Sequence, residues 1–552
     1  MKKFITPDRV FDVVGVFLIA VLPFLIFLKH SGYSLHAPEI LVIFGLVLFF
    51  ALFCGLLMIP GGTPARIIIY AWLAVLIVDV QTDWITILGL RLLLNSVFFG
   101  ALFWSLRRRL TRLAVLTVGL MVLVTAVLPG EKRVTKAGEP ASRAGDNPDL
   151  PFVLHLILDE QIGIEGIPVE FDPEAQVAAE LRDFYLDHSF AVYGRAYSRY
   201  TSTRESVANM LNFASSGVPG HFLEGVFKQG ILLENNLWFD MLHDQGYRIH
   251  VLETSYMGFF EPGEGGVNPH GDTRLSFTTS TIKPLEKADL TFSQKLPFIL
   301  STYFTRSYFL KLAGEAYSNL SFSNIGGKLA LPRWDLNGNY PGALAALQIM
   351  DTFEDQLHQA GPGQAFFAHI LLPHSPYGFD RDCRMELQPG KWLFSHDYQL
   401  APRNNTPEGR AVRYPLYLDQ MFCLQSRLDD MFQILKDKGL WDNAVVIIHG
   451  DHGSRISLWP PIPSLKDVAT PTDYMDSYST LLAVKGPGIP MGYNRQLLPL
   501  DHIFTSLFRD GLPPDDPELE NNPWVYLQDM DKLMVKQPMP SFAHGRIVET
   551  PP

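Results

Sequence analysis

The first 130 residues are dominated by long apolar runs, and these runs constrain the fold more than any other feature of the chain. Val10–Leu28 and Ile40–Ile59 are each long enough to cross a lipid bilayer as a helix. Leu113–Leu128 is slightly short for a crossing, and Ile67–Val80 and Ile85–Trp104 are weaker candidates. A cleaved signal peptide is the alternative for the first run, but further apolar runs follow it directly, so we expect a membrane anchor.

Basic residues precede the first run and separate the fourth run from the fifth: Lys2, Lys3, Arg9, Arg107, Arg108, Arg109 and Arg112. Segments with this positive charge remain on the cytoplasmic side of a membrane. Five crossings place both basic groups there and put everything after residue 130 outside the cytoplasm. If the two weaker runs form one re-entrant hairpin, both basic groups still lie on the cytoplasmic side. If only one of the weaker runs crosses, the two basic groups fall on opposite sides of the membrane. We therefore predict a multi-pass protein with five crossings.

The chain after these runs has the composition of an ordinary soluble protein, and 552 residues are too many for one domain. We expect a transmembrane domain at 1–129, a polar linker at 130–150, a soluble domain at 151–530 and a C-terminal tail at 531–552. The net charge of −12, with no basic stripe in the soluble part, argues against nucleic acid as a partner.

Strand patterns alternate with helix patterns in the soluble part, which indicates an α/β domain with a mostly parallel sheet between helices. Expected strands lie at 152–158, 247–252, 365–372, 444–448 and 478–484. Expected helices lie at 232–245, 342–360 and 414–439. Residues 256–330 are rich in Gly, Ser and Phe and show little periodicity, so we expect loops and short helices there.

The chain contains three cysteines and no CxxC pair. Cys54 lies within an apolar run, whereas Cys383 and Cys423 fall in the exported part. An oxidising compartment favours a Cys383–Cys423 disulfide, and two free thiols are the alternative. The bridge would close a loop of about 40 residues and contribute about 4 kcal/mol in the chain-entropy model.

An acidic residue and a histidine follow one of the expected buried strands. The strand at 444–448 is broken by Gly450 and Gly453, with Asp451 and His452 between them. Open α/β sheets bind ligands at the carboxyl ends of their strands. One carboxylate and one imidazole suit zinc or manganese better than calcium. The alternative is an ordinary turn with a surface Asp and His.

Two further polar groups stand at the ends of expected elements. The first strand of the soluble part ends in Asp159 and Glu160. Later, Ser202 and Glu205 form a capping-box pattern, which places Thr203 in the first turn of a helix. The N–H groups of a helix start favour a bound phosphate or alkoxide there. The alternative is that the hydroxyl residues at this start are merely capping residues.

The order of these motifs resembles the sulfatase-like branch of the alkaline phosphatase superfamily. A strand followed by Leu-Asp-Glu comes first, and a Thr-x-x-Ser helix start follows about 45 residues later. A strand followed by Pro-His-Ser-Pro-Tyr and then His-Gly-Asp-His-Gly complete the series. The preceding crossings make the chain similar to membrane-anchored lipid headgroup transferases, which include lipoteichoic acid synthase and the phosphoethanolamine transferases that modify lipid A. The resemblance implies a bacterial inner membrane protein with its catalytic domain on the periplasmic side.

The resemblance also implies roles for individual residues. It implies one divalent metal, zinc or manganese, on these ligands: Asp159, Thr203, Asp451 and His452. Thr203 is expected as the nucleophile because the Thr-x-x-Ser pattern matches Thr203 and Ser206. His374 matches the family histidine that touches the transferred group or the leaving oxygen.

Three more residues are additional candidates for the site. Glu160 stands where sulfatases carry a second Asp, so it is a candidate ligand. Ser202 is the alternative hydroxyl, and Arg455 follows the Asp-His pair closely.

Two departures from the family bear on specificity. Sulfatases need a Cys or Ser in a C/S-x-P/A-x-R motif, and the only near match, Cys423-Leu-Gln-Ser-Arg427, lacks the Pro or Ala and comes too late. Sulfate ester hydrolysis is therefore not expected. The cysteine count is below that of typical lipid A phosphoethanolamine transferases, which weakens that particular assignment.

The resemblance implies transfer of phosphoethanolamine or phosphoglycerol through a phospho-threonine intermediate. A membrane phospholipid is the expected donor and an envelope glycan or glycolipid the expected acceptor. The metal would activate Thr203, and His374 would donate a hydrogen bond or a proton to the leaving oxygen of diacylglycerol. One alternative is a membrane-anchored phosphodiesterase, phosphatase or sulfatase-like hydrolase. Another is a non-catalytic envelope sensor or assembly factor.

Overall fold

The computed structural model describes residues 7–30, 33–81, 88–106, 109–127, 147–214, 222–227, 230–233, 236–254, 257–259, 275–280, 291–304, 308–332, 340–386, 406–528 and 534–540. The chain divides into two compact units. The first, here called the helical unit, comprises residues 1–134, 282–341 and 387–390. The second, the α/β unit, comprises residues 135–281, 342–386 and 391–552. The predicted linker at 130–150 and tail at 531–552 fall largely outside the described residues.

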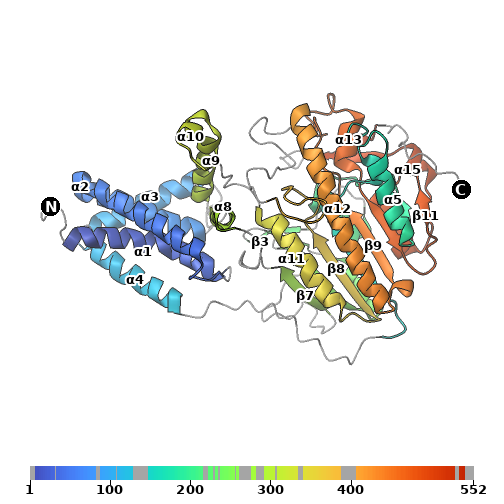
Figure 1. The fold of residues 1–552 in the computed structure, drawn as a ribbon, viewed down its shortest axis with the longest axis horizontal. Coiled ribbons are helices and arrows are strands. Elements are labelled where there is room, and N and C mark those ends of the chain that lie inside the picture. Colours follow the sequence, from blue (N-terminus) through green and yellow to red (C-terminus); the bar gives the residue numbers. More distant parts are fainter. Residues whose placement is uncertain are drawn as a thin grey trace. The chain divides into compact units, whose positions relative to one another are not determined.

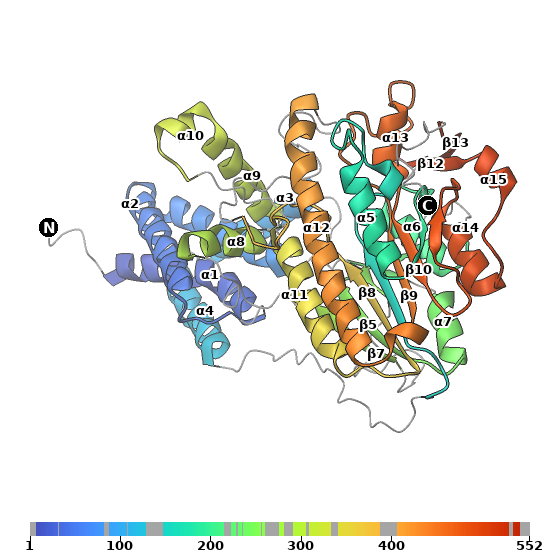
Figure 2. The same cartoon turned by 45° about the vertical axis from the view of Figure 1, so that its right-hand side comes forward.

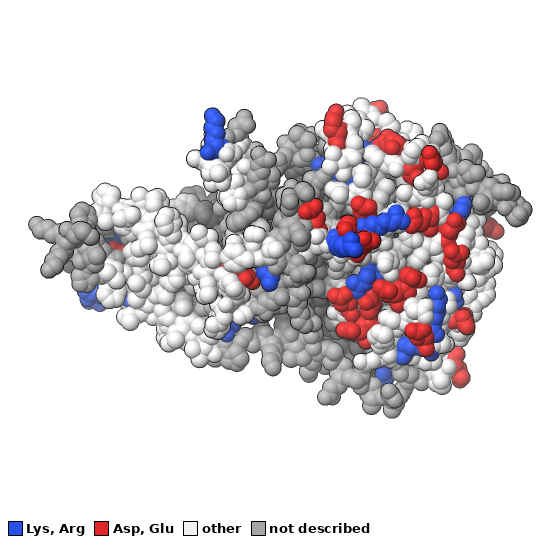
Figure 3. All heavy atoms as spheres, viewed as in Figure 1, with Lys and Arg blue, Asp and Glu red and all other residues white. Residues whose placement is uncertain are grey.

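The helical unit begins with apolar helices (Figure 1). They are α1 (Pro7–His30), α2 (Pro38–Gln81), α3 (Leu88–Ser105) and α4 (Leu110–Val127). Three segments are long and apolar enough to cross a membrane: Val10–Lys29, Pro38–Pro60 and Leu110–Val127. Gly62–Val78 and Leu92–Ser105 are shorter apolar helices. Charged side chains are sparse over these helices and frequent over the α/β unit (Figure 3).

Polar contacts tie the ends of these helices together in pairs. Asp12 near the start of α1 accepts hydrogen bonds from Arg66 and Thr111, each at 2.7 Å. At the other end of α1, Lys29 Nζ donates to the carbonyl oxygen of Ala126 at 3.1 Å. The helix α2 is kinked at Gly62, whose φ is 58°, shortly before Arg66. α1, α4 and the second part of α2 therefore start at the same end of the unit, as five crossings require; the count of five stays a prediction.

Three later helices also belong to the helical unit: α8 (Phe292–Phe304), α9 (Tyr308–Phe322) and α10 (Asn324–Lys328). The helices α8 and α9 pack against α2. The sequence placed this region in the soluble domain as loops and short helices, and the structure groups it with the apolar helices instead.

The α/β unit is built on an eight-stranded sheet with the order β11-β2-β10-β9-β1-β8-β5-β7. Its strands are β1 (Val153–Leu158), β2 (Ala191–Tyr193), β5 (Arg248–Thr254), β7 (Leu275–Ser280), β8 (Gln364–Ile370), β9 (Val445–Gly450), β10 (Leu482–Lys485) and β11 (Gly492–Asn494). Only β10 runs antiparallel to its neighbours among these strands. The predicted α/β domain with a mostly parallel sheet is therefore present.

Helices cover both faces of this sheet, as expected from central strands that are apolar on both sides. Figure 2 shows α5 (Gln176–Asp187), α11 (Tyr340–Leu357) and α12 (Pro407–Asp437) along one face. The other face forms a buried apolar cluster with residues of α6 (Thr203–Leu211), α7 (Leu237–Asp244) and α14 (Leu500–Thr505). Smaller elements are β3 (Phe222–Phe227), β4 (Gly230–Leu233), β6 (Met257–Gly258), α13 (Pro471–Tyr478), α15 (Pro517–Asn521), β12 (Trp524–Gln528) and β13 (Met534–Pro538).

Candidate metal and nucleophile site

The pairing of the central strands determines where the acidic residues lie. The parallel strands β1 and β9 are neighbours, with Leu158 opposite Gly450. Asp159 and Asp451 are the next residues on each strand, so they leave the sheet side by side at its carboxyl edge. On the other side of β1, Leu158 lies opposite Ile370 of β8. The loop that carries His374 therefore starts at the same edge.

Asp159, Asp451 and His452 form a buried cluster whose ligand atoms lie within 4.8 Å of one another. Each side chain belongs to a residue that is at most 1% exposed. Asp159 Oδ1 and Asp451 Oδ2 accept no hydrogen bond, and Asp451 Oδ2 lies 3.2 Å from His452 Nε2. Buried carboxylate oxygens without partners are costly unless a cation neutralises them. The donor set of two carboxylates and one imidazole fits a divalent metal ion.

The imidazole of His452 is oriented so that one nitrogen is free for a metal. His452 Nδ1 lies 2.9 Å from the carbonyl oxygen of Gly453, to which it can only donate. This contact leaves the lone pair of Nε2 available, 3.4 Å from Thr203 Oγ1. Burial lowers the pKa of His452 to about 4, and the positive charge of Arg455 acts in the same direction. The ring is therefore neutral at physiological pH.

The carboxylate of Asp451 is held by backbone groups. Its Oδ1 accepts hydrogen bonds from the N–H groups of Glu160 and His452, both at 3.0 Å. Ser206 Oγ donates to the carbonyl oxygen of Asp451 at 2.6 Å. Thr203 and Ser206 are one turn apart on α6, so one approaches His452 while the other holds the Asp451 loop.

The helix α6 begins at Thr203 as the sequence predicts, but the predicted capping box is wrong. Ser202 occupies the N-cap position without a side-chain hydrogen bond. Glu205 is buried and accepts instead from Gln528 Nε2 of β12 at 3.2 Å. The contact between Glu205 and Gln528 of β12 therefore replaces the predicted hydrogen bond between Glu205 and the start of its own helix. Of the two candidate hydroxyls, the structure brings Thr203, not Ser202, to the cluster.

His369, which lies near the end of β8, was not among the residues predicted from the sequence. Its Nε2 lies 3.2 Å from Asp159 Oδ2. The other oxygen of this carboxylate, Oδ1, is the one that has no hydrogen-bond partner. Burial alone would raise the pKa of Asp159, but the positive charge of His374 and the contact with His369 lower it. The sequence places this histidine near the end of an expected strand, but its approach to Asp159 depends on the pairing of β8 with β1.

Glu160, His374 and Arg455 form a second group beside the first. Glu160 is fully buried, and its Oε1 lies 3.6 Å from His374 Nε2 and 3.7 Å from Arg455 Nη1. Burial raises the pKa of Glu160 to about 7. Despite burial, the carboxylates of Glu160 and Asp159 raise the pKa of His374. Glu160 does not join the three-residue metal cluster among the described residues.

His374 and Arg455 supply positive charge at the rim of the site. Each side chain is 28% exposed, so a ligand can reach it. Arg455 Nε donates to the carbonyl oxygen of Thr201 at 2.9 Å, which places its guanidinium at the start of α6. An anionic phosphoryl group next to Thr203 would therefore meet two cationic side chains and the N–H groups of a helix start.

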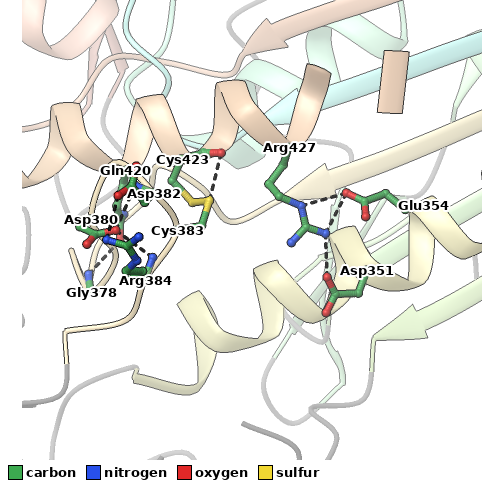
Figure 4. The surroundings of a disulfide bond; sticks show 10 residues. All are labelled: Asp351, Glu354, Gly378, Asp380, Asp382, Cys383, Arg384, Gln420, Cys423 and Arg427. Carbon is green, nitrogen blue, oxygen red and sulfur yellow. Dashed lines mark hydrogen bonds and ion pairs between the residues drawn. A yellow bond between two sulfur atoms is a disulfide. The ribbon is translucent and has the colours of Figure 1, made fainter. Parts of the chain in front are cut away.

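The loop after β8 is attached to α12 by a disulfide and a glutamine (Figure 4). Cys383 is bonded to Cys423 of α12. Gln420 Oε1 accepts from the N–H of Gly378 at 2.8 Å, and its Nε2 donates to the carbonyl oxygen of Pro373 at 3.0 Å. These contacts hold both ends of the segment that follows His374.

A buried network of residues on α12 and α13 contacts the loop that follows Asp451. Arg410 Nη2 of α12 lies 2.5 Å from Asp476 Oδ2, and Tyr414 donates to the same carboxylate. Ser454 Oγ donates to Asp476 Oδ1 at 3.2 Å. The backbone N–H of Arg455 donates to the carbonyl oxygen of Asp476 at 3.0 Å. The loop is thus held by hydrogen bonds to α6 and to α13.

Comparisons with known proteins find likeness among solved structures only. No protein-family model matches the chain, and no curated protein matches it. One similar structure is the C-terminal periplasmic domain of EcEptC from Escherichia coli in complex with Zn, at 12% identity and a TM-score of 0.35, covering 69% of this chain and 91% of that one. Another is the same domain of the phosphoethanolamine transferase EptC from Campylobacter jejuni, at 11% identity and a TM-score of 0.33, covering 67% and 93%.

A third similar structure is the phosphonate monoester hydrolase SpPMH from Silicibacter pomeroyi. It has 14% identity and a TM-score of 0.41, covering 68% of this chain and 80% of that one. At these identities and TM-scores the likeness by itself assigns no activity to the chain.

Proposed function

We propose that the α/β unit transfers a phospholipid headgroup in a metal-dependent reaction, with Thr203 as the nucleophile. One observation carries the proposal. Thr203 Oγ1 lies 3.4 Å from His452 Nε2, beside two buried carboxylate oxygens that have no hydrogen-bond partner. A purely structural role gives no reason to gather unpaired anionic oxygens next to a hydroxyl, whereas a metal-activated nucleophile requires this arrangement.

Zinc or manganese fits the donors of Asp159, Asp451 and His452. When bound, the cation lowers the pKa of a coordinated hydroxyl and neutralises charge on an attacked phosphodiester. Thr203 is the hydroxyl in reach of this cation, because its Oγ1 lies close to His452 Nε2, which is one of the donor atoms. His369 and the N–H groups on Asp451 Oδ1 orient the two carboxylates.

The first step forms a bond between the Thr203 oxygen and the phosphorus of a membrane phospholipid. The bond from phosphorus to the diacylglycerol oxygen breaks, and His374 donates a proton to that oxygen. The proton of the Thr203 hydroxyl is released to water. Phosphoethanolamine or phosphoglycerol remains on Thr203 as a phosphodiester.

In the second step a hydroxyl group of an envelope glycan or glycolipid attacks the same phosphorus. The bond to Thr203 breaks, the Thr203 oxygen takes a proton from water, and the acceptor hydroxyl gives its proton to His374. The donor and the released diacylglycerol both reside in the bilayer. An anchor in the bacterial inner membrane, with the α/β unit on the periplasmic side, suits this chemistry.

Mass spectrometry of the purified full chain tests the intermediate. We expect a headgroup adduct on the Thr203 peptide after incubation with phosphatidylethanolamine or phosphatidylglycerol and one divalent metal. The Thr203→Ala variant should carry no adduct, and the Ser202→Ala variant should carry it as the wild type does. An adduct that survives Thr203→Ala, or its absence from the wild type with every donor and metal, contradicts the proposal.

Product analysis distinguishes the transferase from a hydrolase. With phospholipid labelled in the headgroup, transfer moves the label onto an added glycan or glycolipid acceptor. Release of free labelled phosphoethanolamine or glycerol phosphate at the same rate, with or without acceptors, would assign water as the acceptor instead.

A further inference from the structure

The helices α9 and α10 form a hairpin that leaves apolar side chains exposed at its tip. Ile325 and Leu329 are each 61% exposed. Gly326 is required at the turn, since a Cβ there would lie 2.1 Å from the carbonyl oxygen of Leu320. Ser323 caps α10 by accepting from the N–H of Gly326 at 3.2 Å. The exposed apolar tip is therefore part of a well-defined structure.

The exposed face of α9 continues the apolar surface of the tip. Leu312 and Leu320 are 42% and 41% exposed, whereas the opposite face of α9 buries Ser318 and Ser321. Small residues on the packed face allow close approach to neighbouring helices, as in membrane helix packing. The larger apolar side chains point away from the protein instead.

The helix α8, which precedes the hairpin and packs against α9, lies at the end of the helical unit opposite the start of α1. Tyr303 of α8 contacts Phe24 and Phe27 near the end of α1, with ring centroids 5.1 and 5.4 Å apart. Because α1 leaves the cytoplasm, this end lies on the outer side of the membrane. With 13 and 15 residues, α8 and α9 are shorter than the roughly 20 residues that a crossing needs.

We infer that the tip of α9 and α10 inserts into the outer leaflet of the bilayer that the apolar helices cross. An interfacial helix combines apolar side chains with basic ones that contact lipid phosphates. Lys311 and Lys328 lie beside the apolar residues and are exposed. The contact with lipid holds the segment 282–341 at the membrane surface. It does not depend on the chemistry of Thr203.

Fluorescence quenching by lipids tests this inference on the full chain. Single cysteines replace Ile325 or Leu329 and are labelled with an environment-sensitive dye. The protein is reconstituted into vesicles of phosphatidylethanolamine and phosphatidylglycerol that carry nitroxide groups near the headgroup or deep in the acyl chains. Wild-type protein gives the background, since Cys54 is buried and the other two cysteines are bonded to each other.

Two exposed apolar positions serve as matched controls. Leu116 on α4 is 71% exposed in a predicted crossing, and Val412 on α12 is 56% exposed in the α/β unit. We expect the dyes at Ile325 and Leu329 to be quenched several-fold more than the dye at Val412, most strongly by shallow nitroxides. The dye at Leu116 should respond most to deep nitroxides.

Either of two results would overturn the inference. Dyes at Ile325 and Leu329 that stay as unquenched as the dye at Val412 would show that lipid does not cover the tip. Dyes that shift to shorter emission wavelengths without lipid quenching would show that protein covers it. A dependence of that shift on the protein-to-lipid ratio would identify a second copy of the chain as the cover.

Discussion

At the scale of single residues, the site depends on a hydroxyl and an imidazole that meet next to two carboxylates. Thr203→Ala removes the hydroxyl without disturbing the buried ligands, and we expect it to reduce headgroup transfer roughly a thousandfold or more. Thr203→Ser keeps a hydroxyl on the same helix turn and should retain part of the activity. Initial rates with labelled phospholipid check both, with Ser202→Ala as the control. A similar loss in all three variants would indicate damage to α6 instead of a missing nucleophile.

The low pKa of His452 predicts how metal binding responds to acid. Burial and the charge of Arg455 lower this pKa from 6.5 to about 4, so no proton competes with the metal at Nε2 near neutral pH. Metal affinity contributed by His452 should therefore be fully present above about pH 6 and should be lost only as the pH falls toward 4. Titration of the metal-free protein with zinc across this range checks the prediction. An affinity that already falls tenfold per pH unit below 6.5 would contradict it.

His369 should affect the metal only through Asp159. Its Nε2 contact at 3.2 Å orients the carboxylate, so His369→Ala should weaken metal binding about 10- to 100-fold. His369→Asn keeps a side-chain donor and should recover part of the affinity, which a purely steric role would not explain. Calorimetric titration of both variants gives the comparison. Unchanged affinity in His369→Ala would exclude this positioning role.

The residues of the site could be predicted from the sequence to the extent that they follow buried strands. Asp159 directly follows a run of apolar residues and Asp451 follows another after His449 and Gly450, and such runs are typical of strands buried on both faces. Their proximity required β1 and β9 to be neighbours in register, and a run of apolar residues does not specify its partner. His369 was missed for the same reason, because its role exists only through the pairing of β8 with β1.

At the scale of elements, the disulfide joins the loop after β8 to α12. Cys383→Ser with Cys423→Ser opens a loop of about 40 residues, and we expect a loss of up to about 4 kcal/mol in the free energy of unfolding. Transfer activity should also fall, because the segment after His374 loses one of its attachments. Chemical denaturation monitored in the α/β unit measures the stability. Cys54→Ala in the helical unit is the control and should leave that transition unchanged.

The elements also show where local sequence patterns fail. The capping box predicted at Ser202 and Glu205 is absent because Glu205 binds Gln528, which lies far away in the sequence. The helix α12 was expected from residue 414 but begins at Pro407, where Thr406 caps it by accepting from the N–H of Gly409. Both differences arise at helix starts, where a few competing hydrogen bonds decide the boundary.

At the scale of the whole molecule, the apolar runs of the sequence correspond closely to the helices of the helical unit. The sequence could not reveal that residues 282–341 return to this unit. The segment lacks a long apolar run, and its helices are stabilised by contacts with α1 and α2 that periodicity does not encode. Five crossings predict that the α/β unit lies outside the cytoplasm. Protease added to intact spheroplasts should digest this unit, and protection until lysis would contradict the predicted orientation.

Metal content measured on the purified full chain tests the central claim most directly. We predict one divalent ion per chain in the wild type, close to none in Asp451→Asn, and one in Glu160→Gln, which changes an adjacent acid outside the cluster. Asp451 belongs to the three-residue cluster, whereas Glu160 does not and lies 3.6 Å from His374 and 3.7 Å from Arg455. Equal metal content in the wild type and Asp451→Asn, or loss only in Glu160→Gln, would contradict the account.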